Sequence, residues 1–429
     1  MPSPSFNSFQ QTFALSWASN LVGTCTGSAA EIQDKLNKAL SSDYLNNNVG
    51  PGWSVVWGPA IWQHNPNPEK PAGPDNVWFI AKHDSFVTEG QDPKPAYVVC
   101  IAGTAGTGEG FDGTFEDVAV GRVVDLNQWI PDGFTGDVIP SPAVASDPDF
   151  TGSTPYVSYG TSIGTYVIAS MSPVALDGQA STHSSVSAFL KNEVVAPGTR
   201  LIFTGHSLGA ALCPTLAFVL DKAQLLSNFS KVLVYPTAGA TPGDSSFVSA
   251  FSRRFPAIPP AEGQPAYMTW NENIVNSLDI VPHAWCTLST YPQNLNVIPT
   301  IYGNSPQQGF IPFSILTVLK GKLVTPAKNA WPEKPKQNVY IPLPSSVFSS
   351  GQEPFPTTQA ELETRMMFCH IRAYIDLICG PDFKFTPGPC ATVANDEHIP
   401  VGLSRILEYV ESLPDDPERL EKYLVAENQ

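Results

Sequence analysis

Short apolar runs alternate with amphipathic stretches along the first two thirds of the chain. Helical spacing of apolar residues occurs at 32–40, 186–195 and 208–226. Ser28 and Glu31 form a capping box before the first of these helices. Strands alternating with helices predict a mostly parallel central sheet flanked by helices, the α/β class. The runs that predict strands, rich in β-branched and aromatic residues, lie at 53–57, 77–81, 97–102, 199–204, 231–235 and 267–270.

The pattern becomes irregular and proline-rich after residue 286. This region contains a continuous apolar segment, Gly309 to Leu319, and a predicted strand at 339–343. Helical spacing returns at 362–378 and 401–413. No repeat or linker divides the chain. We therefore expect one domain over residues 1–429, with an N-terminal helical extension and a long insertion at 286–364 that contributes to a cap or lid.

Composition supports a large folded core and argues against polyanionic partners. Hydrophobic residues make up 42 % of the 429 residues, charged residues only 14 %, and the formal net charge is −16. Such a charge repels phosphate groups, so we expect no nucleic-acid partner. The N-terminal twenty residues contain no Lys or Arg and do not resemble a secretory signal. The longest apolar segment is too short to cross a membrane. A cytoplasmic location is the expectation that follows.

The seven cysteines are scattered and show no C-x-x-C spacing. Cys100 and Cys213 lie inside apolar elements, as buried thiols do. We therefore expect reduced cysteines rather than a disulfide framework. Cys379 and Cys390, in a loop-rich stretch, are the pair that remains open for a disulfide.

The pentapeptide Gly205-His-Ser-Leu-Gly209 matches the G-x-S-x-G pattern. A predicted strand ends directly before it and a predicted helix begins directly after it. The two glycines allow a sharp turn that holds Ser207 in a strained conformation and exposes its hydroxyl. An ordinary glycine-rich turn with an N-capping serine is the alternative. The strand–turn–helix context favours Ser207 as a nucleophile.

A serine nucleophile needs a histidine base, and in this architecture the base follows the serine in the chain. Only three histidines do so, and we rank His370 first, then His398 and then His283. His370 lies at the start of a helical pattern, where it can reach the sheet edge. His206 precedes the serine, and its side chain is expected to point away across the turn in a structural role.

The acid that orients the base is expected between the serine and the histidine. Asp279 follows the predicted strand at 267–270, where loops lie at the carboxyl edge of the sheet. Asp244, within Pro-Gly-Asp-Ser, is more typical of a turn or a helix cap. Asp279 is therefore the preferred acid.

Five segments in order resemble motifs of the class 3 lipase family, which includes filamentous-fungal lipases and plant acyl hydrolases. One of the five, residues 235–247, resembles its family motif but lacks the Phe and Arg of that motif. A second departure lies in another of the five, where Ala102 replaces the usual Arg before Gly103. The other four are GHSLG at 205–209, N-x-x-D-I-V-P at 276–282, H-x-x-x-Y at 370–374, and VVCIAGT at 98–104.

This resemblance implies an α/β-hydrolase fold and a triacylglycerol lipase-like carboxylic-ester hydrolase. It implies Ser207 as nucleophile, His370 as base and Asp279 as orienting acid. It also implies that the backbone amides of Thr104 and Leu208 form the oxyanion hole. The expected partner is an acyl-ester or lipid substrate, with transient contact to a lipid interface left open. No cofactor and no metal are expected.

Two other functions remain open at this point. A catalytically silent α/β-hydrolase that serves as a scaffold is one, although a silent copy has no need of all three triad residues. An acyltransferase is the other, because it uses the same triad and the same acyl-enzyme.

An apolar cover over the nucleophile is expected for an enzyme of greasy substrates. The family resemblance places a lid within 105–150. Composition instead indicates that the cover is Gly309 to Leu319, because this segment has more apolar side chains than a surface loop exposes to water. We predict that this second segment lines the acyl-binding side of the Ser207 pocket.

Overall fold

The structure is a computed structural model. It describes residues 4–391 except for 65, 67–71, 89, 106–110, 118, 176–183, 287, 303–339, 352–355 and 357. The predicted cover at 309–319, the predicted helix at 401–413 and the candidate base His398 lie outside the described residues. These three expectations therefore stay predictions.

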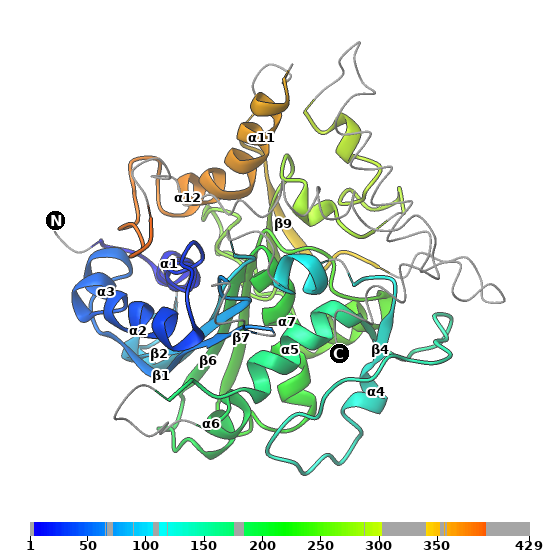
Figure 1. Ribbon diagram of the computed structural model, residues 1–429, viewed down its shortest axis with the longest axis horizontal. Helices are drawn as coiled ribbons and strands as arrows, with labels where there is room; N and C mark the ends of the chain where they lie inside the picture. Colours follow the sequence, from blue (N-terminus) through cyan, green and yellow to red (C-terminus); the bar gives the residue numbers. More distant parts are fainter. Residues whose placement is uncertain are drawn as a thin grey trace.

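A seven-stranded sheet forms the centre of the molecule (Figure 1). Its order is β1-β2-β3-β6-β7-β8-β9; the first three strands pair antiparallel, and every later neighbour pairs parallel. A separate two-stranded antiparallel sheet joins β4 (Val123–Asp125) to β5 (Tyr156–Ser158). The strands of the main sheet are β1 (Trp53–Trp62), β2 (Asn76–Phe86), β3 (Lys94–Ile101), β6 (Arg200–His206), β7 (Lys231–Thr237), β8 (Asn273–Asn276) and β9 (Ser345–Phe348).

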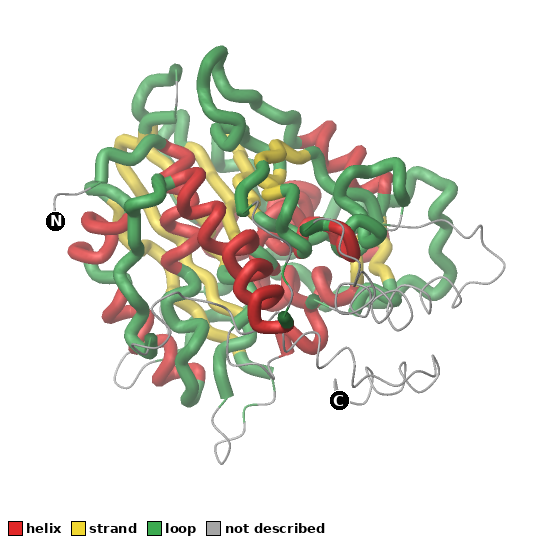
Figure 2. The backbone as a smooth tube through the Cα atoms, turned by 90° about the horizontal axis from the view of Figure 1, so that it is seen from above, coloured by secondary structure: helices red, strands yellow, loops and turns green. Residues whose placement is uncertain are grey.

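Helices cover both faces of this sheet, as the apolar runs require (Figures 1 and 2). Helices α1 (Ser8–Ala18), α2 (Ala29–Ala39) and α3 (Ser42–Asn48) pack on one face. The opposite face carries α5 (Tyr159–Ser170), α6 (Val186–Asn192) and α7 (Leu208–Lys222). The remaining helical segments are η1 (Asp112–Glu116), α4 (Leu126–Trp129), α8 (Ser245–Arg254), η2 (Val281–His283), η3 (Ile298–Thr300), α11 (Gln359–Met367), η5 (Phe368–Arg372) and α12 (Ala373–Ile378).

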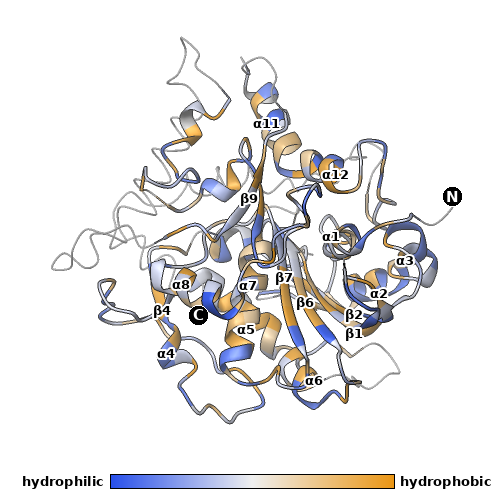
Figure 3. Ribbon diagram, turned by 180° about the vertical axis from the view of Figure 1, so that it is seen from behind, coloured by the Kyte–Doolittle hydropathy of each residue, from blue (hydrophilic) through white to orange (hydrophobic). Residues whose placement is uncertain are grey.

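Alternate residues of the central strands enter two different cores. In β2, Phe79 packs into the core beneath α1, whereas Trp78 and Ile80 pack into the core beneath α5 and α7. The period of two in side-chain direction explains why these strands are apolar throughout. Figure 3 shows the resulting concentration of hydrophobic residues along β6 and β7.

Most predicted elements of the first two thirds are present, including the capping box of Ser28 and Glu31 on α2. The predicted strand at 267–270 is wrong, because the strand begins later, as β8. Asn271 has a φ of 67° and interrupts the run, and its side-chain oxygen accepts a hydrogen bond from the Val234 N–H of β7. A non-strand residue therefore occupies the edge of β7 at that point.

The predicted strand at 339–343 is also displaced. Residues 341–344 are irregular, and the strand at this edge is β9, at 345–348. Pro342 and Pro344 have no N–H to donate to a ladder, which explains the shift. Helices α1 and α5 were not predicted. Both are buried over most of their circumference, so their sequences lack an amphipathic pattern.

One disulfide, Cys25–Cys390, joins the segment after α1 to the segment after α12. The expectation of reduced thiols is wrong for these two residues, and Cys379 does not pair with Cys390. The partners are 365 residues apart in sequence, so only the fold brings them together. Four of the other cysteines are buried and Cys379 is half-buried, and all five lie outside the disulfide as reduced thiols, as expected: Cys100, Cys213, Cys286, Cys369 and Cys379.

Replacing Cys25 and Cys390 together by Ser should lower the free energy of unfolding by about 3–5 kcal/mol, because the bond closes a very long loop in the unfolded chain. Urea denaturation of the double variant against the parent measures this. The matched control is Cys379→Ser, which leaves the disulfide intact. A Cys379–Cys390 peptide in a non-reducing digest would contradict the assignment.

Candidate active site

Ser207 lies at the sharp turn between β6 and α7. Its backbone has φ 58° and ψ −124°, a strained conformation for a residue with a side chain. The turn is closed so tightly that a Cβ on Gly205 would lie 2.3 Å from the Gly209 carbonyl oxygen. A Cβ on Gly209 would lie 2.4 Å from the carbonyl oxygen of Ile101 in β3. Both glycines of the pentapeptide are therefore required by close backbone contact.

The structure brings the three sequence-predicted residues into one line of hydrogen bonds. His370 Nε2 lies 2.9 Å from Ser207 Oγ, and His370 Nδ1 lies 2.8 Å from Asp279 Oδ2. The carboxylate accepts a hydrogen bond from the Nδ1–H, which leaves the Nε2 lone pair facing the serine hydroxyl. This tautomer has the arrangement that a general base requires.

Asp279 is fully buried, and other donors besides His370 hold its carboxylate. The Val281 N–H donates to Oδ1 at 3.1 Å, and the Tyr374 hydroxyl donates to Oδ2 at 2.9 Å. The Tyr374 oxygen in turn accepts from the Asn276 N–H at 2.9 Å. Burial and the charge of Asp279 raise the pKa of Tyr374 well above its usual value, so the hydroxyl remains a donor. The sequence indicates Tyr374 only as part of the H-x-x-x-Y motif, and this contact with Asp279 is additional.

His370 lies in η5, a π-helical turn between α11 and α12. Such turns interrupt the regular hydrogen-bond ladder and are frequent at functional sites. The side-chain amide of Asn276 donates to the Cys369 carbonyl at 3.0 Å, and so ties this turn to β8. His370 is thus anchored to the same strand that leads to Asp279.

The other acid and histidines considered from the sequence form different contacts. Asp244 caps α8, accepting from the Phe247 N–H at 2.8 Å, as expected of a helix cap. His283 is buried in η2, where its Nδ1 accepts from the Asn294 N–H at 3.2 Å. The His206 ring bonds to groups other than the Ser207 side chain; its Nε2 lies 2.8 Å from the His370 carbonyl oxygen.

The two amides predicted to bind an oxyanion lie beside the elbow. Thr104 follows β3, and Leu208 is the first residue of α7. In the part of the chain that the structure describes, neither N–H donates to another group. The preceding Gly103 packs against the elbow, since a Cβ there would lie 2.9 Å from the His206 carbonyl oxygen. Asn20 Oδ1 accepts from the Gly103 N–H at 2.9 Å and fixes this strand end.

Carboxyl groups gather directly behind Thr104. Asp117 accepts from the Thr104 hydroxyl at 2.7 Å, Asp112 accepts from the Ala105 N–H, and Glu116 accepts from the Asn76 side chain at 2.9 Å. We call Asp75, Asp112, Glu116 and Asp117 the carboxyl cluster.

No Lys or Arg within the described ranges forms an ion pair with the carboxyl cluster. Burial raises the pKa of Asp75 to about 6 and that of Asp117 to about 7. Burial also raises the pKa values of Asp112 and Glu116 well above their usual range. Among the residues described, no group of His, Cys, Asp or Glu side chains could hold a metal ion.

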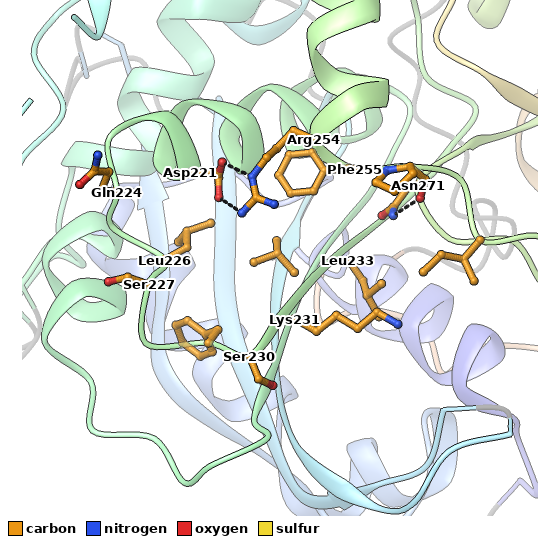
Figure 4. A pocket seen from close by; sticks show the side chains of 14 residues that line it. Asp221, Gln224, Leu226, Ser227, Ser230, Lys231, Leu233, Arg254, Phe255 and Asn271 are labelled. Atoms are coloured by element: carbon orange, nitrogen blue, oxygen red, sulfur yellow. Dashed lines mark hydrogen bonds and ion pairs between the residues drawn. The ribbon is translucent and has the colours of Figure 1, made fainter. Parts of the chain in front are cut away.

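A pocket of about 540 Å³ lies at the opposite end of the sheet from Ser207 (Figure 4). It is lined by Lys231, where β7 begins, and by the ion pair of Arg254 and Asp221. The carboxyl ends of the parallel strands carry Ser207, whereas this pocket lies near their amino ends. It is therefore separate from the candidate active site.

A mostly parallel sheet that carries a serine on a strand–turn–helix elbow defines an α/β-hydrolase. Residues 142–288, about a third of the chain, match the family model described as lipase (class 3). This match confirms the resemblance inferred from the motifs, and its range includes Ser207 and Asp279. Over residues 142–288 the chain is therefore similar to the class 3 lipases, and its fold resembles that of a solved lipase.

A solved lipase structure resembles the chain in fold. M37 lipase is 20 % identical with a TM-score of 0.57, over 87 % of this chain and 93 % of its own. The Yarrowia lipolytica LIP2 lipase is 14 % identical with a TM-score of 0.35, over 66 % and 74 %. The Rhizopus microsporus var. chinensis lipase is 16 % identical with a TM-score of 0.33, over 66 % and 74 %. No curated protein sequence matches the chain.

Glu116→Gln should flatten the pH dependence of stability. The pKa of Glu116 is raised in the folded state, so folding retains a proton that the unfolded chain releases above about pH 4.5. Stability of the parent should therefore fall relative to the variant as pH rises from 5 to 7, by up to about 1.4 kcal/mol per pH unit. Urea denaturation at several pH values measures this difference.

The exposed Glu262 provides the control, since Glu262→Gln should leave the slope unchanged. Parallel pH profiles for the parent and Glu116→Gln would contradict the picture of a protonated carboxyl in the carboxyl cluster.

Proposed function

We propose that the protein hydrolyses acyl esters through an acyl-enzyme formed on Ser207, with His370 as base and Asp279 as orienting acid. The observation that carries this proposal is the unbroken line of hydrogen bonds from Ser207 Oγ through His370 to Asp279. A serine hydroxyl is a poor nucleophile alone, and this line supplies the base and the group that orients it.

The chemistry follows in two halves. Ser207 Oγ bonds to the ester carbonyl carbon while its proton passes to His370 Nε2. The bond from that carbon to the alcohol oxygen then breaks, and the alcohol leaves with the proton. Water, deprotonated by His370, next attacks the acyl carbon. The bond from that carbon to Ser207 Oγ breaks, Oγ takes the proton back from His370, and the carboxylic acid leaves. Asp279 stabilises the imidazolium that forms in each half.

The Thr104 and Leu208 amides are the proposed donors to the oxyanion. Both lie beside the elbow, and neither donates elsewhere in the described structure. The Thr104 side chain is held by Asp117, so the position of its amide is fixed before substrate arrives. Donors fixed in this way stabilise developing charge without reorganisation.

Lipases of this family act on lipid esters, and we propose the same substrate class here. None of the described helices is long and apolar enough to cross a membrane. An acyltransferase would share the acyl-enzyme and differ only in the acceptor. A silent scaffold is disfavoured by the hydrogen bond between His370 and Ser207, which a binding module does not need.

Ser207→Ala should abolish hydrolysis of soluble p-nitrophenyl esters, with a loss on the order of 10⁶ in kcat, because the variant has no nucleophile. His370→Ala should lose nearly as much. The kinetics of both variants are measured beside circular dichroism, which shows that they remain folded. Substantial turnover by folded Ser207→Ala would refute the nucleophile.

Two further experiments complete this test. His283→Ala, the matched histidine control, should keep most of the activity of its folded fraction, because the ring nitrogens of His283 bond to Ser277 and Asn294. A fluorophosphonate should label the native protein at Ser207. Failure of the native protein to react would favour the scaffold. Ester formation from an added alcohol that outruns hydrolysis would favour the acyltransferase.

A further inference from the structure

His206 is a buried histidine that the proposed mechanism does not use. It is the last residue of β6 and directly precedes Ser207, yet its side chain is 3 % exposed. Its two ring nitrogens have different partners: Nδ1 lies 2.9 Å from Thr237 Oγ1, and Nε2 lies 2.8 Å from the main-chain oxygen of His370. Both nitrogens of this ring are therefore occupied.

These partners define the protonation of the ring. A main-chain carbonyl oxygen only accepts hydrogen bonds, so Nε2 carries the proton and Nδ1 accepts from the Thr237 hydroxyl. Burial lowers the pKa of His206 well below its usual value, and the nearby His370 lowers it further. His206 is thus a fixed neutral donor aimed at the backbone of another histidine.

The contact closes a short loop of interactions around Ser207. His206 and Ser207 are adjacent in the chain, and His370 bonds to both of them. Its carbonyl accepts from the His206 ring, and its own ring faces the Ser207 hydroxyl. The end of β6 and the η5 turn are thereby tied together beside the hydrogen bond between base and nucleophile.

The other tether of this turn comes from a different strand. Asn276 of β8 donates to the carbonyl of Cys369, and Asp279 holds the His370 ring. Neither interaction fixes η5 relative to β6, the strand that carries the nucleophile. The bond from His206 supplies that connection.

We propose that His206 is a positioning residue that sets the distance between the His370 imidazole and Ser207 through the main-chain carbonyl of His370. This role rests on the proposed function of Ser207 and His370. A displacement of about 1 Å in a reacting pair reduces rates by roughly 10²-fold, so the bond matters to turnover. A histidine that only fills the core would have no such effect.

Two substitutions of His206 distinguish the effects of its two hydrogen bonds. A glutamine amide reaches about as far as Nε2, so His206→Gln keeps a donor for the His370 carbonyl. An asparagine amide reaches only as far as Nδ1, so His206→Asn keeps a partner for Thr237 and loses the bond to His370. Both variants place an amide in the same buried site.

The experiment compares kcat of the two variants with that of the parent on a soluble short-chain p-nitrophenyl ester. His206→Gln should stay within about fivefold of the parent, and His206→Asn should fall by roughly 10- to 100-fold with KM unchanged. Rates are counted per folded molecule, from the far-UV circular dichroism signal. Equal kcat for the two variants, or a higher kcat for Asn, would overturn the proposal.

Phe13→Leu is the control for lost packing. Phe13 of α1 meets the His206 ring edge-on, with 6.4 Å between ring centroids, and its other ring contacts in the described structure are with Trp17 and Phe385. Its truncation should lower the midpoint of thermal unfolding and leave kcat per folded molecule unchanged. A kcat loss as large as that of His206→Asn would mean that packing alone explains the effect.

An NMR measurement tests the contact independently of turnover. The ring ¹⁵N and ¹H signals of His370 should move in His206→Asn and remain near the parent positions in His206→Gln. If the parent neither hydrolyses esters nor reacts with a fluorophosphonate, the proposed function fails, whereas these signals still report whether His206 holds His370. Unmoved signals in His206→Asn would refute the positioning role.

Discussion

The buried carboxylate of Asp279 constrains everything around it, because a buried charge is costly unless several donors meet it. Three donors do so here: the His370 ring, the Tyr374 hydroxyl and the Val281 N–H. They come from the π-helical turn, the helix after it and the loop that bears the aspartate. Satisfying one carboxylate therefore fixes the relative positions of two segments that lie about ninety residues apart in sequence.

Ser207 and His370, the proposed nucleophile and base, are thus held from two sides. On one side, β8 and its loop bear Asn276 and Asp279. Asn276 binds a backbone carbonyl of the η5 turn, and Asp279 binds the ring of the histidine in that turn. On the other side β6 ends in the strained elbow, and the glycines on both sides of Ser207 bring α7 and β3 close. His370 lies where these two supports meet.

The central strands and the nucleophile elbow could be predicted from sequence, because double-sided burial and glycine requirements leave direct local patterns. Asp279 and His370 were predicted from chain order and family resemblance, and the structure brings them together. Helix α1 escaped prediction because burial on most sides removes its amphipathic signal. The prediction of a strand at 267–270 was wrong because Asn271 lies beside β7 instead. This contact joins segments that are distant in sequence, so no local pattern reveals it. The roles of Tyr374 and of the carboxyl cluster depend on contacts that no local pattern encodes.

The disulfide between Cys25 and Cys390 gives the protein an unusual covalent topology. Residues 25 to 390 form a closed ring, and every residue of the proposed active site lies on it. A protease that cuts one exposed loop opens the ring without releasing a fragment. The nicked protein keeps the mass of the intact chain, plus one water, until a reductant separates its two pieces. Loops inside the ring are therefore sites where the backbone is broken without loss of either half of the molecule.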